Sequence, residues 1–484
     1  MIWLRYQFFP KLSAILAVVF SLSILFPPLP ASAMTIQEER ELGEKVLQEV
    51  VKIWPMVQDP APKEYVTRIG KRVLATMETQ PFDYEFYVLN STEINAFAVP
   101  GGKVFINSGL ITTVENEDEL AGVMAHEIGH VVARHVARQS EQGTKLALAT
   151  LGALLAGILL GPQAAAAIGI TGQAAATTAM LKYSRENEEE ADYLGMKFME
   201  RAGYDPKAMV TMMKKLRRAS GPAGSSPPAY LLTHPAVEQR MGNLEVQMMN
   251  LPSVERNRLP EGNMKRIQTK LVAEEKDAAR SVAFFENCQK RQPDDAECFL
   301  GLGLGQRRMG ALDRSVESLS KAASLSPQDP EILRELGAAY FLSGNLPEAQ
   351  KYMEQASSLS PADAKAQFYL GRVYLEQKKV DEALQALLKA NKLQPEWGEN
   401  YYHLGMAYGA KGMLGPAYRS LGYYYKLTGD RKTALAQFQR ALPYFTDPSS
   451  ERAGLQKEIQ ELTPKKQGPD WNRSKGPQRR FLLF

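Results

Sequence analysis

The chain has 484 residues, of which 44% are hydrophobic and 23% are charged, and its formal net charge is +4. A single hydrophobic core rarely grows beyond about 300 residues, so this length predicts at least two domains. The composition is typical of a globular protein and argues against a multi-span membrane protein or a disordered chain. The small net charge gives no reason to expect a nucleic-acid partner.

The first 33 residues have the pattern of a secretory signal peptide. Arg5 and Lys11 precede an apolar run from Leu12 to Phe26, and Ala31-Ser32-Ala33 resembles a signal peptidase site. The apolar run is shorter than the roughly 20 residues that a membrane-spanning helix needs. We therefore expect export and cleavage after Ala33. An uncleaved N-terminal membrane anchor is the alternative.

Two helices and a small β-sheet are predicted next. Charged, amphipathic stretches interrupted by prolines occupy residues 38–77. Strand-like segments follow at residues 84–89 and 103–106, with a turn at Pro100-Gly101-Gly102 before the second strand. A further helix is expected to start near Asn116, which is a favourable N-cap residue.

Residues 146–181 are unusually apolar and rich in small side chains. Gly161-Pro162 divides this stretch into pieces that are short for membrane spans, so we expect a buried or interfacial helical pair. Contact with a membrane surface is the alternative. An acidic helix is predicted for residues 184–201, and a loop over residues 219–232 then leads to Thr233-His234-Pro235.

The C-terminal half contains an internal repeat. Two sets of residues recur every 34 positions: Pro293, Pro327, Pro361 and Pro395, and Gly303, Gly337, Gly371 and Gly405. This spacing resembles the tetratricopeptide pattern, in which each repeat is a pair of packed helices. We expect an all-α repeat domain of at least four units over residues 262–445, with a 17-residue phase shift near its end. The tail over residues 463–484 is basic and is expected to be disordered.

The segment His126-Glu127-Ile128-Gly129-His130 carries the strongest chemical signal. Histidines four residues apart on a helix face the same way, so His126 and His130 can bind one metal ion. Glu127 cannot share their direction, but it can reach a water molecule on the same ion, which is the position of a general base. We therefore predict a metallopeptidase site on this helix.

A catalytic zinc site needs a third protein ligand from another element. Residues 184–192 offer several acids, of which we favour Glu188. Spacing alone cannot choose between these acids, and a solvated acidic helix face is the alternative. Asp192 lies one turn beyond Glu188 on the same face. It can therefore orient a ligating histidine if Glu188 binds the metal.

The histidine motif, together with the acidic helix and the Asn95-Ala96-Phe97-Ala98 segment, resembles the HtpX and BepA group of zinc metallopeptidases. The resemblance extends through Thr233-His234-Pro235 and the repeats. It implies an α+β zincin-like metalloprotease domain, mostly α with a small β-sheet, over residues 34–255. An all-α tetratricopeptide-repeat solenoid follows this domain. The implied site holds one Zn²⁺ per chain, with His126, His130 and Glu188 as ligands, Glu127 as base and an active-site role for Asp192.

The resemblance also implies roles beyond the metal ligands. The strand from Asn95 to Ala98 is implied to bind extended substrate along its edge through backbone pairing. His234 resembles a histidine that can occupy the fourth metal position and hold such enzymes inactive, and Arg240 is expected to brace the site. The implied location is the periplasm. The implied substrates are unfolded or misassembled envelope proteins, and the implied partner of the repeats is outer-membrane assembly machinery.

Other histidines and the cysteines are interpreted as structural. His135 lies five residues after His130 and points well away from the metal face, so we expect a packed or partly exposed structural histidine. His403 belongs to a repeat helix. Cys288 falls at a small, packed repeat position, so both a buried thiol and a disulfide with Cys298, which an exported protein permits, stay open.

The sequence as a whole predicts a zinc-dependent endopeptidase with a repeat array that recruits substrates or partners. The alternative is a periplasmic chaperone or adaptor, in which binding by the repeats dominates and proteolysis is latent.

Overall fold

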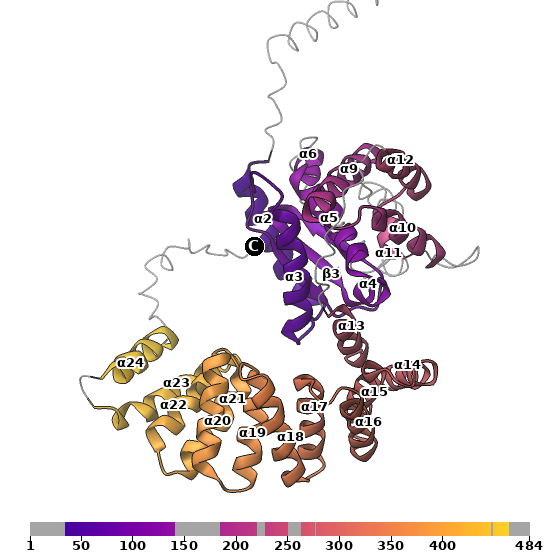
Figure 1. Cartoon of the computed structure of the whole chain (residues 1–484). Coiled ribbons are helices and arrows are strands. Elements are labelled where there is room, and N and C mark those ends of the chain that lie inside the picture. The colour runs from indigo at the N-terminus through magenta and orange to yellow at the C-terminus, as the bar shows by residue number, and fades with distance from the viewer. Residues whose placement is uncertain are drawn as a thin grey trace, which may run out of the picture. The chain divides into compact units, whose positions relative to one another are not determined.

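A computed structural model of the chain describes residues 34–140, 184–219, 228–249, 263–275, 277–446 and 449–463 (Figure 1). The predicted signal peptide, the apolar stretch 146–181 and almost all of the predicted tail lie outside the described residues. The chain divides after Glu275 into two units. Within the described ranges, no helix is both long enough and apolar enough to cross a membrane.

In its described part, the first unit is mostly helical, with one three-stranded sheet. Its helices are α2 (Ile36–Ile53), α3 (Pro60–Leu74), α4 (Ser108–Thr113), α5 (Glu117–Val132), α6 (His135–Ser140), α9 (Arg185–Ala202), α10 (Lys207–Ala219), α11 (Ala229–Thr233), α12 (Val237–Met249) and α13 (Met264–Ala273). Its strands are β1 (Glu85–Leu89), β2 (Ala96–Val99) and β3 (Lys103–Asn107), with the short 3-10 helix η1 (Pro100–Gly102) between β2 and β3. The strand order is β1-β3-β2, with β1 parallel and β2 antiparallel to β3, so β2 is an edge strand.

The sheet lies between two helical layers because its side chains are apolar on both faces. On one face, the rings of Phe97 and Phe105 stack 4.9 Å apart and pack in a cluster with residues of α2. On the other face, Ala98, Val104 and Ile106 join the main core with residues of α3 and α5.

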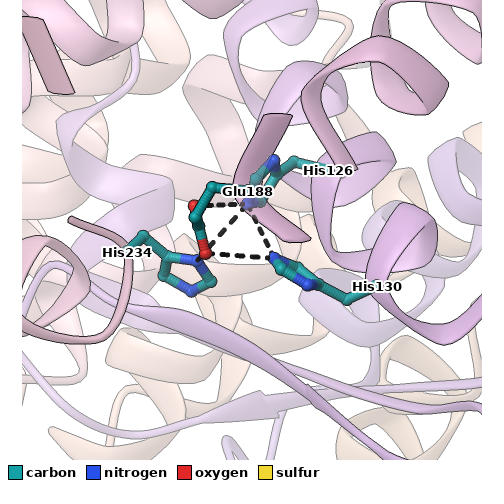
Figure 2. Close-up of side chains that lie close together, drawn as sticks. All are labelled: His126, His130, Glu188 and His234. Carbon is teal, nitrogen blue, oxygen red and sulfur yellow. Dashed lines mark hydrogen bonds and ion pairs between the residues drawn. The ribbon is translucent and has the colours of Figure 1, made fainter. Parts of the chain in front are cut away.

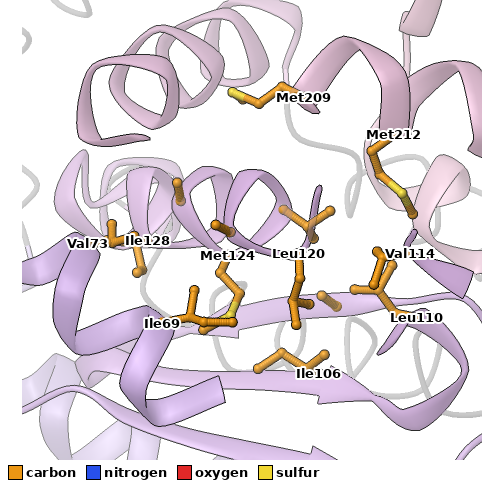
Figure 3. Packing of buried hydrophobic residues seen from close by; sticks show 14 of the residues in the cluster. Ile69, Val73, Ile106, Leu110, Val114, Leu120, Met124, Ile128, Met209 and Met212 are labelled. Atoms are coloured by element: carbon orange, nitrogen blue, oxygen red, sulfur yellow. The ribbon is translucent and has the colours of Figure 1, made fainter. Parts of the chain in front are cut away.

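Helix α5 is the centre of this main core. Figure 3 shows Leu120 and Met124 of α5 directed toward Ile106 of the sheet and Ile128 beside Val73 of α3, with Met209 of α10 on the opposite side of the helix. Burial on both sides explains why the helix is apolar almost all round. The histidine motif is therefore part of a packed interior.

Helices α5 and α9 approach closely because glycines face the contact. A Cβ atom added to Gly129 of α5 would lie 2.9 Å from the carbonyl oxygen of Ala191 in α9. A Cβ atom on Gly195 of α9 would lie 3.1 Å from the backbone nitrogen of His126. This close packing brings the acidic residues of α9 next to the histidines of α5.

In its described part, the second unit is all-helical. Its helices are α14 (Ala278–Arg291), α15 (Ala296–Arg308), α16 (Leu312–Leu325), α17 (Pro330–Leu342), α18 (Leu346–Leu359), α19 (Ala364–Glu376), α20 (Val380–Leu393), α21 (Gly398–Ala410), α22 (Leu414–Leu427), α23 (Arg431–Ala441) and α24 (Ser450–Leu462), with the 3-10 helix η2 (Leu442–Tyr444) after α23. Together, the two units confirm the predicted fold class of a small-sheet α+β domain followed by an all-α repeat solenoid.

The recurrent glycines allow the two helices of each repeat to pack closely. Their missing side chains would meet a large apolar residue of the next helix: Leu319 at Gly303, Met353 at Gly337, Leu387 at Gly371 and Leu421 at Gly405. Gly422 has the same relation to Phe438, so α22 packs against α23 as well as α21. Helix α22 is thus the second helix of one pair and the first helix of the next pair. This arrangement accounts for the predicted phase shift of 17 residues, which is half a repeat.

One detail of the fold differs from the sequence interpretation. Helix α13 belongs to the first unit, because Ile267 and Leu271 pack in its core and Gln268 donates hydrogen bonds to the carbonyl oxygens of Ile111 and Val114. The sequence had placed the start of the repeat domain near residue 262, before this helix.

The structure also decides the state of the cysteines, which the sequence left open. Cys288 and Cys298 form a disulfide that joins α14 to α15. The spacing of the repeats places the two residues on paired helices, which brings their Cα atoms to 5.5 Å.

Candidate metal centre

Helix α5 presents two imidazoles to one point. The helix begins where Asn116 accepts a hydrogen bond from the backbone N–H of Glu119, as its N-cap preference predicts. One turn apart on this helix, His126 and His130 bring their Nε2 atoms to 3.0 Å from each other. Both rings are almost completely buried.

Helix α9 adds a carboxylate to this pair. Ser184 caps the helix by accepting a hydrogen bond from the backbone N–H of Asn187. Glu188, in the first turn, is fully buried, and its two oxygens lie 3.5 Å from the Nε2 atoms of His126 and His130. Of the acids that the sequence offered, Glu188 is therefore the one that reaches both histidines.

His234, which directly follows α11, adds a third imidazole to the group. His234 Nδ1 lies 3.0 Å from Glu188 Oε1 and 3.3 Å from His126 Nε2 (Figure 2). The Tyr230 ring stacks on the His234 ring with a centroid distance of 4.4 Å. Ala236 has a positive φ of 62°, which turns the chain sharply into α12.

This group has the donor chemistry of a divalent metal site. His126, His130, Glu188 and His234 are all buried, and each offers one ligand atom within 4.8 Å of the others. Three imidazole nitrogens and one carboxylate oxygen are ligands typical of zinc and of the neighbouring transition metals. A metal ion would stabilise this buried cluster, because each of its polar groups has lost its hydration.

The protonation states of His130 and Glu188 suit a metal ion. Burial lowers the pKa of His130 well below its ordinary value, which keeps the ring neutral. Burial alone would raise the pKa of Glu188, but the neighbouring His234 and Arg240 hold it well below its usual range. A neutral imidazole and an ionised carboxylate are the forms that bind metals. His126 differs: burial lowers its pKa, but the Asp192 and Glu188 carboxylates outweigh this effect and raise the pKa to about 9, so a metal ion would have to displace a proton there.

Asp192 and Arg240 contact the candidate ligands from outside the group. Asp192 Oδ1 lies 2.8 Å from His126 Nδ1, on the side of the ring away from the group of ligands. Arg240 of α12 donates two hydrogen bonds of 2.7 Å to the Asp192 carboxylate, and a third guanidinium nitrogen lies 2.6 Å from Glu188 Oε2. Burial opposes ionisation of Asp192, but Arg240 lowers its pKa to about 2.

Glu127 occupies the position expected of a base. One carboxylate oxygen, Oε2, accepts a hydrogen bond of 3.1 Å from the backbone N–H of Ala98. Among the described residues, no group donates a hydrogen bond to the other oxygen, Oε1, which lies 3.4 Å from His234 Nε2. Burial raises the pKa of Glu127, which makes the carboxylate a stronger base.

The edge strand β2 passes directly beside Glu127. Because Ala98 uses its N–H for Glu127, this N–H points away from β3 and toward the free edge of the sheet. Asn95 is buried at the start of the strand. The Phe97 side chain lies on the opposite face of the sheet and contacts Trp54, so only its backbone belongs to this edge.

The sequence interpretation missed the position of His135. Helix α5 ends at Val132, and Arg134 adopts a left-handed conformation with φ of 53° before α6 starts at His135. The ring of His135 is consequently folded back against His130, with 2.7 Å between the two Nδ1 atoms. Nothing in the spacing predicted this contact, because a spacing argument assumes that the helix continues.

Residues 60–247 match Peptidase family M48, and residues 300–356 and 343–405 match tetratricopeptide repeat families. Residues 60–247 form an M48 peptidase domain. This M48 domain contains α5, the Glu188 segment of α9 and His234, so the predicted resemblance to the HtpX and BepA group is confirmed.

Individual relatives support the M48 assignment. The Beta-barrel assembly-enhancing protease of Yersinia pestis is 37% identical over 226 residues, which cover 45% of this chain and 46% of that protein. The Mitochondrial metalloendopeptidase OMA1 of Schizosaccharomyces pombe is 35% identical over 185 residues, which cover 37% of this chain and 51% of that protein. The chain thus spans about half the length of the curated relatives it matches.

Among solved structures, the crystal structure of MamA matches with 26% sequence identity and a TM-score of 0.29, covering 35% of this chain and 92% of that chain. A TM-score of this size supports no conclusion about architecture.

Proposed function

We propose that this chain is a zinc-dependent metalloendopeptidase of the cell envelope, with one Zn²⁺ held by His126, His130 and Glu188. The observation that carries the proposal is the convergence of these three buried side chains within an M48 domain, beside the Glu127 carboxylate. In this role, Asp192 orients His126, and Arg240 holds Asp192 and Glu188 in place.

The side chains around the ligands can perform peptide hydrolysis. A bound zinc ion supplies a Lewis acid that polarises the scissile carbonyl and makes a water molecule acidic. Glu127 accepts the proton of the attacking water through Oε1 and then returns it to the leaving amine. The backbone N–H of Ala98 keeps the Glu127 carboxylate in place, and the edge of β2 aligns an extended substrate by backbone pairing.

His234 fits the role of a latch in this proposal. Its ring lies 3.0 Å from Glu188 and 3.4 Å from Glu127, so it fills the space between a ligand and the base. A substrate carbonyl and the attacking water both need access to this space. We therefore propose that His234 holds the resting enzyme inactive and moves away when substrate binds.

The decisive experiment compares the wild type with Glu127→Gln. We expect the variant to retain about one zinc per chain, because its ligands are intact, and to lose cleavage of casein by several orders of magnitude. Zinc content is measured by elemental analysis and cleavage by release of fluorescent peptides. Turnover in the variant at the wild-type rate, or wild-type protein that binds no zinc, would refute the proposal.

We also propose that the enzyme works in the periplasm on unfolded or misassembled outer-membrane proteins. The relatives named Beta-barrel assembly-enhancing protease support this substrate class, and the sequence of residues 1–33 supports export. The Cys288–Cys298 disulfide supports an oxidising location, because such bonds are rare in the cytosol.

The repeat array is proposed to recruit these substrates or the assembly machinery. The first helices of successive repeats, α15, α17, α19 and α21, contact one another and form a continuous surface. On this surface, Arg307 and Arg334 are paired with Glu335 at 2.7 and 2.8 Å. These pairs leave little free charge for a ligand.

Arg372 of α19 differs from these two arginines. Its guanidinium lies 4.6 Å from the ring centre of Phe341 and 5.5 Å from those of Phe368 and Tyr369, and no carboxylate of the described residues forms an ion pair with it. Stacking on rings leaves the edge of a guanidinium able to donate hydrogen bonds. We propose that the site formed by Arg372 and these three rings binds partner segments in which a carboxylate lies beside apolar side chains.

The second candidate function is that of a chaperone or adaptor, which would bind its partners through this surface. An adaptor role predicts that the Glu127→Gln protein still restores assembly of outer-membrane proteins in cells that lack the wild-type chain. The peptidase proposal predicts that it does not.

A further inference from the structure

The two histidines of α5 have different partners on their outer nitrogens. His126 Nδ1 lies 2.8 Å from a carboxylate oxygen of Asp192. His130 Nδ1 lies 2.7 Å from Nδ1 of His135, and the other nitrogen of His135 lies 3.1 Å from Glu190 Oε2. His135 is completely buried.

One arrangement of protons satisfies this series of contacts. An imidazole that binds a metal through Nε2 carries its proton on Nδ1, so His130 must donate to His135 Nδ1. His135 then carries its own proton on Nε2 and donates it to Glu190. Arg138 completes the series by donating a hydrogen bond of 2.6 Å to the Glu190 carboxylate.

From this geometry, we infer that His135 is a positioning residue that connects the Glu190 carboxylate to the metal ligand His130. His126 receives the same support directly from Asp192. A carboxylate behind a ligating imidazole fixes its tautomer and ring orientation and raises its basicity. The inference rests on the proposed zinc site.

The turn between α5 and α6 determines the position of His135. Arg134 holds the left-handed turn between α5 and α6, and such a conformation costs of order 1 kcal/mol for a residue other than glycine. The Arg134 side chain donates a hydrogen bond of 2.6 Å to the buried Glu39 of α2 and a further one to the backbone oxygen of Met34. These contacts offset the strain and fix the direction of His135.

The test measures the zinc affinity of the full chain by competition with a chelator. We expect His135→Ala to weaken zinc binding by about 10-fold to 100-fold, the usual effect of losing a residue behind a metal ligand. His135→Gln is expected to recover most of this loss, because its amide can accept from His130 and donate to Glu190. Glu189→Ala is the matched control, since this neighbouring acid bonds instead to Gln239 and Asn243 of α12.

A second variant tests the series of contacts rather than His135 alone. Glu190→Ala should weaken zinc binding in the wild type but have no further effect in the His135→Ala protein, because the path to His130 is already broken. Glu190 is 43% exposed, so this change does not depend on filling a buried space. Thermal unfolding with and without zinc accompanies each measurement.

The possible results distinguish a failure of the proposed zinc site from a failure of the inference about His135. Wild-type protein without zinc affinity would overturn the proposed function and this inference together. Normal zinc affinity in both His135→Ala and Glu190→Ala would overturn the inference alone. An equal drop in unfolding temperature with and without zinc, at unchanged affinity, would assign His135 a purely structural role. If His135→Ala does not fold, His135→Gln and Glu190→Ala decide the question.

Discussion

At the scale of single residues, the candidate metal group contains three proposed ligands on rigid helices and one histidine from a turn. His126, His130 and Glu188 are fixed by α5 and α9, whereas His234 follows the five-residue helix α11. A side chain on a short segment can leave the group without moving the core. This difference is the structural basis for treating His234 as a latch rather than a permanent ligand.

The latch makes a prediction for His234→Ala. The variant should cleave casein faster than the wild type, with a gain equal to the reciprocal of the fraction of wild-type molecules in the open state. Initial rates at saturating zinc measure this gain. The double variant with Glu127→Gln should be inactive, which shows that the gain arises at this site. An unchanged or lower rate in His234→Ala would count against the latch.

Residue positions could be predicted from the sequence only where a regular element carries them. The spacing of His126 and His130 on one helix predicts that their imidazoles face the same way, and their Nε2 atoms lie 3.0 Å apart. Glu188 could not be chosen among the acids of α9 by spacing, because the choice depends on how α9 packs against α5. His135 was missed because the left-handed Arg134 ends the helical periodicity.

At the scale of secondary structure, the geometry of the site depends on the contact between α5 and α9. The contact is closest where Gly129 faces the backbone of Ala191, which a side chain cannot displace easily. Glu188 and Asp192 lie on either side of this point. A shift of α9 by a few tenths of an ångström therefore moves both acids relative to the histidines.

We predict that Gly129→Ala destabilises the chain by about 1–3 kcal/mol, the usual cost of overpacking, and weakens zinc binding. Urea unfolding and chelator competition measure the two effects. Gly242→Ala on α12 is the control, because an added Cβ meets nothing within 4 Å there and alanine favours a helix. Equal unfolding midpoints for the Gly129→Ala protein and the wild type would contradict the prediction.

Most helices and strands could be predicted from the sequence. Their assignment to one or the other of the two units was harder to predict. The helix start at Asn116, the two strands and the 34-residue repeat all follow from local patterns. Helix α13 has an ordinary amphipathic pattern that fits a repeat equally well. Its place in the first unit depends on a distant partner, the end of α4, which Gln268 contacts through hydrogen bonds.

At the scale of the whole molecule, the position of α13 affects how the repeat array can be tested. A truncation near residue 262 would remove Ile267 and Leu271 from the core of the peptidase unit. Loss of activity would then report instability rather than loss of recruitment. A substitution on the surface of the array avoids this problem.

We predict that Arg372→Ala weakens binding of an unfolded outer-membrane β-barrel protein by about tenfold, as expected for the loss of a hydrogen bond to a charged group. Binding is measured in the Glu127→Gln background, which prevents cleavage. Casein cleavage by Arg372→Ala in the active background should match the wild type. Lys389→Ala removes a similar charge from α20 and is the control. Equal affinities of the Arg372→Ala and wild-type arrays would exclude the proposed site.

The disulfide between α14 and α15 has a consequence for the maturation of the chain. The sequence contains only two cysteines, so oxidation has a single intramolecular product and no mispaired isomer exists. The two residues are ten positions apart, and closure of so short a loop takes well under a millisecond. The chain therefore needs an oxidant but no disulfide isomerase, and the bond can form as soon as this one hairpin has folded.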